Sequence, residues 1–98
     1  MVDSILDFIV HGGADTVGVA VRDVPGAQTL TGWNMEKDET LSLESRDPVA
    51  LGHKVALVDI ARGEKVVKYN RPIGNSTQDI ARGAHVHTHN LRTARWQQ

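Results

Sequence analysis

Short apolar runs, broken by glycine and proline, constrain the fold of this chain more than any other feature of its sequence. Such runs lie at Val17–Val21, Lys54–Val58, Lys65–Tyr69 and His85–His89. Nine glycines and three prolines occur along the 98 residues, as a chain with many tight turns requires. Runs this short, either β-branched or strictly alternating, predict strands. We therefore expect a mostly β domain with tight, glycine-containing turns and no long helix.

Two further segments fit the same architecture. Ser4–Val10 suits either a helical turn or a first strand, because periodicity does not separate the two over seven residues; we favour the strand. Glu36–Glu44 is polar with alternating leucines, and it predicts one arm of a hairpin.

An internal repeat also indicates β structure. Asp59-Ile60-Ala61-Arg62-Gly63 recurs as Asp79-Ile80-Ala81-Arg82-Gly83, and Asp23-Val24-Pro25-Gly26 is a looser copy. In each copy the Asp can accept backbone N–H groups of a turn, and the Gly can adopt a positive φ. We expect each unit to be strand, tight turn, strand, with the Ile buried beneath.

Composition excludes several classes of function. Eleven basic and 12 acidic residues give a net charge of −1, so no overall positive field attracts nucleic acid or a membrane surface. The absence of cysteine excludes disulfides, cysteine zinc sites and thiol catalysis. Asp7 interrupts the longest apolar run, far short of the ~20 residues of a membrane span, and the start lacks a signal peptide's basic region. We expect one cytoplasmic domain, residues 1–98, with no nucleic-acid or membrane partner.

Histidines provide the strongest chemical signal. His85, His87 and His89 alternate along one predicted strand, where alternate side chains share a face about 6.6 Å apart. His85 and His87 can converge on one ion, and imidazole suits iron, zinc, nickel or copper. The alternative is a solvated polar strand face without a ligand. Three alternating histidines favour a role in binding metal or substrate.

Three other positions have weaker signals. His53 and Lys54 follow a glycine before an apolar strand and suit acid–base chemistry on a carboxylate, although a polar turn explains the tripeptide alone. His11 precedes two glycines that allow close approach of a ligand, yet a flexible loop is the simpler interpretation. Arg46 can bind an anion bidentately, although a surface ion pair with an acidic neighbour is favoured. Dinucleotide, Walker, serine-hydrolase and zinc-protease motifs are absent from the sequence.

Segments along most of the chain resemble one family, in its order: Val17–Val21, Gly52–Leu57, Asp59-Ile60, Lys68-Tyr69, Ile73-Gly74, Asp79–Ala81 and His85–His87. The chain resembles the N-terminal SAF-like module of altronate and galactarate dehydratases, which implies a small β-clip fold. In those enzymes the module is fused to a much larger catalytic part, so this chain resembles a stand-alone small subunit. A closer resemblance, to the sulfolactate-cleaving members, lies in Phe8–His11, Thr31–Trp33, Glu44–Asp47, Leu51–Lys54 and His85–Trp96.

The resemblance implies a metal-dependent lyase that is active only with a large (beta) catalytic subunit. It would eliminate sulfite from (2R)-3-sulfolactate, a small 2-hydroxy acid, to give pyruvate. The alternatives are the small subunit of an altronate-type sugar-acid dehydratase and a non-catalytic SAF-like ligand-binding module. The implied cofactor is a divalent metal, Fe²⁺, with further ligands and the catalytic base on the large subunit.

The resemblance also implies roles for individual residues. His11 and His53 are expected to be catalytic, and His85 and His87 to bind the metal. Lys54 is expected to bind the substrate carboxylate and Arg46 its sulfonate. Trp33, Trp96 and the histidine face offer more surface than a small core needs, so we expect a stable complex with the large subunit through a face that includes part of Leu91–Trp96.

Overall fold

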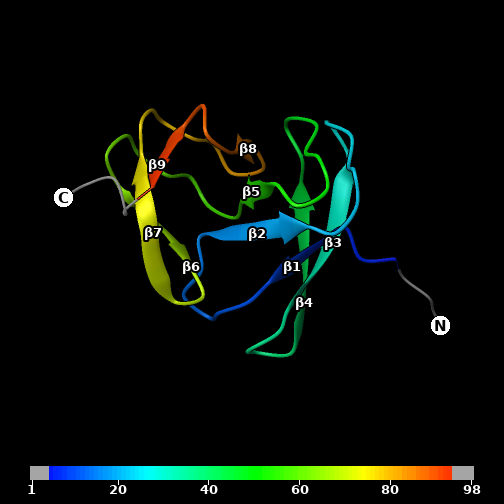
Figure 1. Cartoon of the computed structure of the whole chain (residues 1–98). Helices are drawn as coiled ribbons and strands as arrows, with labels where there is room; N and C mark the ends of the chain where they lie inside the picture. The colour runs from blue at the N-terminus through cyan, green and yellow to red at the C-terminus, as the bar shows by residue number, and fades with distance from the viewer. Residues whose placement is uncertain (1–4, 94–98) are drawn as a thin grey trace.

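A computed structural model describes residues 5–93, which form nine strands in two sheets (Figure 1). The larger sheet has the order β4-β3-β1-β2-β5-β8, with β1 and β3 parallel and the other neighbours antiparallel. The smaller, antiparallel sheet has the order β6-β7-β9. The strands are β1 Phe8–Val10, β2 Val17–Ala20, β3 Thr29–Asn34, β4 Glu39–Glu44, β5 Lys54–Ala56, β6 Lys65–Lys68, β7 Arg71–Ser76, β8 His85–Val86 and β9 Leu91–Thr93.

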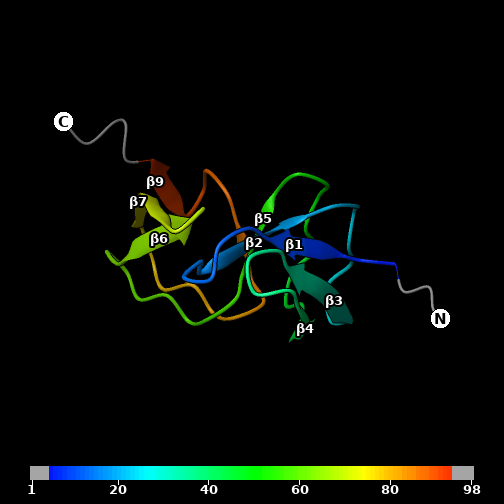
Figure 2. The ribbon, with the colours of Figure 1, turned by 90° about the horizontal axis from the view of Figure 1, so that it is seen from below.

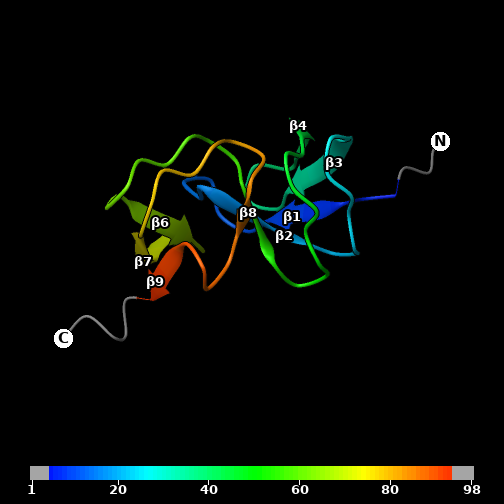
Figure 3. The same ribbon diagram turned by 90° about the horizontal axis from the view of Figure 1, so that it is seen from above.

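The smaller sheet lies at one end of the described chain, and strands β2 and β5 of the larger sheet lie between it and the β3–β4 hairpin (Figures 2 and 3). The small sheet is near the C-terminal end, and the β3–β4 hairpin is at the other end. Residues 5–93 contain no helix, which confirms the expected mostly β fold. Consequently, none of these residues belongs to a helix long and apolar enough to span a bilayer.

Most predicted strands are confirmed, with narrower bounds. Strands β2, β5 and β6 lie inside three of the predicted runs, and β1 confirms a strand within Ser4–Val10. The predicted arm at Glu36–Glu44 contains β4, after a turn that closes the hairpin with β3.

The predicted five-residue strand His85–His89 is wrong in its extent. Only His85 and Val86 pair as β8, and the chain then turns. The turn is closed by Asn90, whose Oδ1 accepts the His87 N–H at 2.9 Å and whose side-chain amide donates to the His85 carbonyl at 2.8 Å. These local bonds compete with continued strand pairing.

The internal repeat forms a reciprocal pair of turns. Ile60 and Ile80 exchange two backbone hydrogen bonds of 2.8 Å, and both are buried as expected. Each Asp accepts a backbone N–H from the other copy's turn, not from its own: Asp79 from Arg62 at 2.9 Å and Asp59 from Arg82 at 2.8 Å. The repeat therefore locks together two segments that are twenty residues apart.

The looser copy of the repeat pairs in a similar way. Val24 bridges Val49, and Asp23 accepts the Leu51 N–H at 2.8 Å. This pairing holds the loop that leads into β5. The repeat and its looser copy thus position β5, which follows His53, and β8, which contains His85.

Two apolar clusters make up the core, and strands β2 and β5 contribute to both. One cluster gathers around the larger sheet and the other around the smaller one. The first contains Phe8, Val10, Ala20, Val24, Leu30, Leu43, Val49 and Val55, and the second contains Val17, Ala56, Ile60, Val66, Ile80, Val86 and Leu91.

Phe8 is the largest fully buried side chain, and it packs on two glycines of the flanking strands. A Cβ built on Gly32 would lie 2.2 Å from the Phe8 ring, and one on Gly18 would lie 2.8 Å from it. Asp7, which interrupts the apolar run in the sequence, is buried beside Phe8. Its carboxylate accepts the Arg22 Nε–H at 2.7 Å and the Thr31 backbone N–H at 2.8 Å.

Gly32→Ala should therefore lower the free energy of unfolding by about 1–3 kcal/mol, the usual cost of overpacking a core. Chemical denaturation of the two proteins measures the difference. Gly13→Ala is the matched control, because its Cβ would meet only the ends of the Glu36 and Lys37 side chains. Equal stability of the Gly32→Ala variant and the unmodified chain would contradict the Phe8 packing argument.

Candidate functional site

The pairing of β5 with β8 brings three histidines together. Lys54 lies opposite Val86 in this antiparallel pair, so continuing the register places His53 opposite His87. The imidazole rings of His53 and His87 stack with centroids 3.7 Å apart, and His53 Nδ1 lies 2.8 Å from His85 Nε2. Ligand nitrogens of the three side chains all lie within 4.8 Å of one another. We call His53, His85 and His87 the histidine cluster.

Backbone contacts hold the cluster in place. The Asp47 carboxylate accepts the His85 N–H at 2.9 Å. On the other strand, the His53 carbonyl accepts the Ala20 N–H and the His53 N–H donates to the Ala50 carbonyl, both at 2.9 Å. Gly52, immediately before, has φ +85°, a conformation that favours glycine. Both sides of the cluster are thus anchored to the larger sheet.

The surroundings favour neutral imidazoles. Burial is the largest cause lowering the pKa of His85 below its ordinary 6.5, and the other histidines lower it further, against a smaller opposing effect of Asp47. Burial, followed by His53 and Lys54, also lowers the pKa of His87. Because only neutral imidazole has a free lone pair, both shifts favour the form that binds metal.

The donor set fits a divalent transition metal. Three imidazole nitrogens suit iron, zinc, nickel or copper, and nitrogens bound to one ion at about 2.1 Å lie at most about 4.2 Å apart. Small side-chain rotations would therefore let the histidine cluster share an ion. His89 lies beside the cluster, with its ring centroid 5.0 Å from that of His85.

Lys54 lies next to the histidine cluster and is only partly exposed. Burial lowers its pKa, and the positive charge of Lys68 lowers it further. In the β5–β8 pair Lys54 lies opposite Val86, and Val55 lies opposite His85. Because side chains alternate between the two faces of a strand, the Lys54 side chain lies on the face away from His85. The structure therefore brings together three of the six predicted site residues, His53, His85 and His87, and the substrate-binding role of Lys54 stays a prediction.

His11 lies outside the histidine cluster. Its ring packs on Tyr69, with centroids 4.3 Å apart, and Lys68 Nζ lies 4.9 Å from the centre of the same Tyr69 ring. The Tyr69 ring thus contacts both His11 and Lys68. Neither Tyr69 nor Lys68 was given a role from the sequence.

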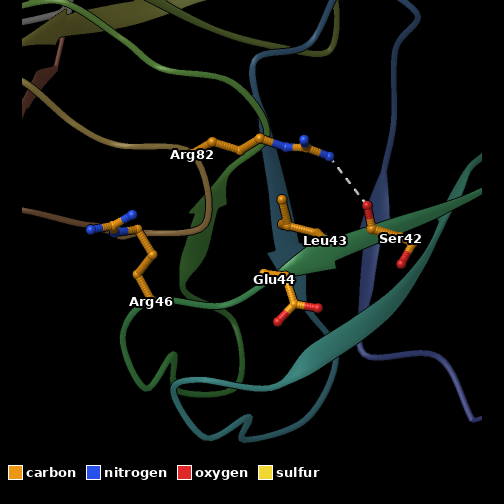
Figure 4. A pocket seen from close by; sticks show the side chains of 5 residues that line it. All are labelled: Ser42, Leu43, Glu44, Arg46 and Arg82. Carbon is orange, nitrogen blue, oxygen red and sulfur yellow. Dashed lines mark hydrogen bonds between the residues drawn. The ribbon is translucent and has the colours of Figure 1, made fainter.

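Arg46 lines a different part of the surface. Its side chain borders a cavity of about 300 Å³ with Arg82, Glu44, Ser42 and Leu43 (Figure 4). Arg82 donates to the Ser42 carbonyl, and the Arg46 guanidinium extends away from it. None of the clustered histidines lines this cavity. The sulfonate role of Arg46 stays a prediction.

The predicted partner-facing residues are only partly described. Trp33 is half-buried, and its indole N–H donates to Asp38 at 3.0 Å. Of the segment Leu91–Trp96, the last three residues lie outside the described range. The partner-facing role of both stays a prediction.

The chain is similar in sequence to sulfolactate sulfo-lyase alpha subunits and to altronate dehydratases. The chain is 48% identical over 92 residues to the (2R)-sulfolactate sulfo-lyase subunit alpha of Chromohalobacter salexigens, covering 93% of this chain and 98% of that protein. It is 44% identical over 54 residues to the subunit of the same name from Paracoccus pantotrophus, 55% of this chain and 81% of that protein. The altronate dehydratase of Escherichia coli is 43% identical over 88 residues, 90% of this chain but 17% of that enzyme.

A family model for the altronate/galactarate dehydratase SAF domain matches residues 6–94, which is nearly the whole chain and includes every predicted site residue. The strands, the paired turns and the histidine cluster all lie within this match. The chain belongs to the altronate/galactarate dehydratase SAF domain family.

Proposed function

We propose that this chain is the small subunit of a two-subunit, metal-dependent lyase that eliminates sulfite from (2R)-3-sulfolactate to give pyruvate. One observation carries the proposal: three imidazoles cluster in a chain that matches 98% of the length of a sulfolactate sulfo-lyase alpha subunit. A partner is proposed because the same region makes up only 17% of an altronate dehydratase. The remaining machinery is expected on a large (beta) subunit. A cytoplasmic location stays a prediction of the sequence.

The reaction sets the tasks for the site. A base removes the proton from C2, the electron pair forms the C2–C3 double bond, and the C3–S bond breaks to release sulfite. The resulting enol takes a proton at C3 and becomes pyruvate. A divalent ion, which we propose to be Fe²⁺, supplies Lewis acidity toward the carboxylate and 2-hydroxyl oxygens when bound.

Residues of this chain would perform part of these tasks. His85 and His87 donate nitrogens to the ion, and the geometry adds His53 as a third donor, an alternative to its expected acid–base role. Lys54 binds the substrate carboxylate beside them. His11 is proposed to move a proton, and the base acting on C2 is proposed to lie on the large subunit.

A second candidate function is a sugar-acid dehydratase. The 43% identity to an altronate dehydratase favours it, because elimination of water from a 2-hydroxy acid requires the same proton removal and the same charge stabilisation. A non-catalytic ligand-binding module is the third alternative, and it requires no large subunit.

Co-expression with the proposed large subunit should give a stable complex that forms equal amounts of pyruvate and sulfite from sulfolactate. Size-exclusion chromatography and product analysis test this, with altronate as the comparison substrate. The chain alone should be inactive. Release of water from altronate with no sulfite from sulfolactate would select the dehydratase, and two separate monomers would contradict the assembly.

Replacing both His85 and His87 with Ala should remove bound metal and activity from the complex while the fold is retained. Metal analysis and circular dichroism measure the two effects. His11→Ala is the matched control, because His11 lies against Tyr69 and not in the histidine cluster, so its metal content should stay unchanged. His53→Ala should also lose metal if His53 is the third donor. If the double variant keeps its metal, the histidine cluster does not bind the ion and is a solvated polar face.

Lys54→Gln should lower kcat/KM for every accepted substrate by about ten- to a hundredfold, the effect of losing a charged hydrogen bond worth about 1.5–3 kcal/mol. Steady-state kinetics of the complex measure this loss. Lys37→Gln is the control, since Lys37 lies in the exposed turn between β3 and β4. If kcat and KM of the Lys54→Gln variant equal those of the unmodified complex, Lys54 does not bind the carboxylate, and that role falls to the large subunit.

A further inference from the structure

A groove lies at the free edge of the larger sheet, where β4 is the outermost strand. Ser42 of β4 lies opposite Thr31, whose N–H and carbonyl both bond Asp7, so the Ser42 backbone faces away from β3. The outward Ser42 carbonyl accepts a hydrogen bond from the Arg82 guanidinium at 3.3 Å. A side chain, and not a strand, thus covers this part of an edge that is available for pairing with another chain.

Two adjoining cavities make up the groove. The cavity of about 300 Å³ that Figure 4 shows shares Ser42, Leu43 and Arg82 with a second cavity of about 180 Å³. The residues that line only the second cavity are Phe8, Leu41 and Leu57. Its wall is therefore largely apolar, and since a cavity of about 150 Å³ holds a benzene ring, it has room for a leucine or phenylalanine side chain. We call the two cavities the Arg82 groove.

Two arginines give the groove its charge. Arg46 and Arg82 both line it. Within the described part of the chain, the one ion pair within 4.0 Å is that of Asp7, so no described carboxylate pairs with either guanidinium. The Glu44 carboxylate, which also lines the groove, accepts the Thr29 hydroxyl. A guanidinium binds carboxylates bidentately, and arginine is among the residues that contribute most to the affinity of protein–protein interfaces.

The turn that carries Arg82 packs against the end of β4. The Arg46 N–H donates to the Gly83 carbonyl at 2.8 Å. Gly83 has φ +88°, and a Cβ on it would clash with the Glu44 carbonyl, so this close approach requires glycine. Both arginines are therefore held at one groove by backbone contacts that do not depend on their side chains.

The groove lies close to the histidine cluster along the chain. Asp47 follows Arg46, and its carboxylate accepts the His85 N–H at 2.9 Å. A subunit that covers the histidine cluster therefore meets the groove at its Arg46 end. In an altronate dehydratase, the region that matches this chain is 17% of the enzyme, so a partner that supplies the remainder would be much larger than this chain and able to cover both.

We propose that the Arg82 groove is a docking site for an acidic segment of the large subunit. One apolar side chain of that segment fills the cavity beside Leu41 and Leu57. Carboxylates next to it bind the guanidinium groups of Arg82 and Arg46. This inference rests on the proposed function, and it gives Arg46 a partner-binding role in place of the sulfonate-binding role that the resemblance implies.

Charge reversal tests the docking site in the complex. Arg82→Glu should raise the dissociation constant of the two subunits about tenfold or more, as for the loss of a charged hydrogen bond, which isothermal titration calorimetry measures. Arg62→Glu is the matched control, because Arg62 is the equivalent exposed residue of the internal repeat and lines neither cavity. An unchanged dissociation constant for Arg82→Glu, or equal losses in the two variants, would overturn the proposal.

The apolar part of the groove has its own test. Leu57→Ala should also raise the dissociation constant, whereas Val58→Ala, at the neighbouring exposed position, should leave it unchanged. Circular dichroism verifies that both variants are folded. Equal affinities of the two folded variants would contradict insertion of an apolar side chain beside Leu57.

Kinetics separate docking from substrate binding. At subunit concentrations that saturate the complex, Arg46→Gln should keep the Michaelis constant for sulfolactate. At lower concentrations it should lose activity, because the subunits dissociate. A raised Michaelis constant in the saturated complex would overturn the docking role of Arg46 and assign it to the sulfonate.

A measurement on the chain alone separates this inference from the proposed function. The full 98-residue chain is titrated with N-acetyl-leucyl-glutamate, a probe that combines an apolar side chain with two carboxylates, and followed by NMR. We expect shifts at Leu41, Leu57 and Arg82 that are lost in Arg82→Glu and retained in Arg62→Glu.

The outcomes are distinct. Subunits that associate but release no sulfite from sulfolactate would refute the proposed function, while the titration still decides the groove. Absent shifts, or shifts that persist in Arg82→Glu, would overturn the docking site. A dimer of this chain alone that Arg82→Glu dissociates in size-exclusion chromatography would also overturn it, because the occupant would then be a second copy.

Discussion

The pairing of β5 with β8 is the contact on which the candidate site depends. It places His53 opposite His87, although the two are far apart in the sequence. Two residues of pairing are not enough to hold a strand in register by themselves. The reciprocal turns around Ile60 and Ile80 supply the missing constraint, because each Asp binds the other turn's backbone just before the chain enters β6 or β8. The repeat therefore fixes the geometry of the histidines without contributing a ligand.

An exposed site of this kind is incomplete as a catalyst. All three clustered histidines are half-buried at the surface of the chain, where water is the competing ligand and where charges are screened. Elimination needs a site from which water is excluded, so that electrostatic contacts reach their full strength. In the altronate dehydratase relatives, this region is one sixth of a longer chain. A large subunit that covers the histidine cluster would supply both the exclusion of water and the missing base.

Local signals predicted the strands but not their ends or their partners. Short β-branched runs located β2, β5 and β6 because burial of alternate side chains leaves a pattern in the sequence. The end of β8 depends on one side chain, Asn90, whose turn bonds override the alternation of the histidines. His53 joins His85 and His87 only through cross-strand register, which no local pattern contains. The packing of His11 on Tyr69 was missed for the same reason, because it joins segments far apart in the sequence.

The distribution of charge around the candidate site favours an anionic ligand. The carboxylates near the site accept hydrogen bonds from backbone N–H groups. Asp47 accepts the His85 N–H, and Asp15 accepts the Gly12 and Asn70 N–H groups. They order the loops without neutralising the lysines. Lys54 and Lys68 form no ion pair with the described carboxylates, so their positive charges favour anions. Under the proposed function, a substrate with two negative groups would supply a counter-charge to each of two ammonium groups, whereas a sugar acid with a single carboxylate would supply only one.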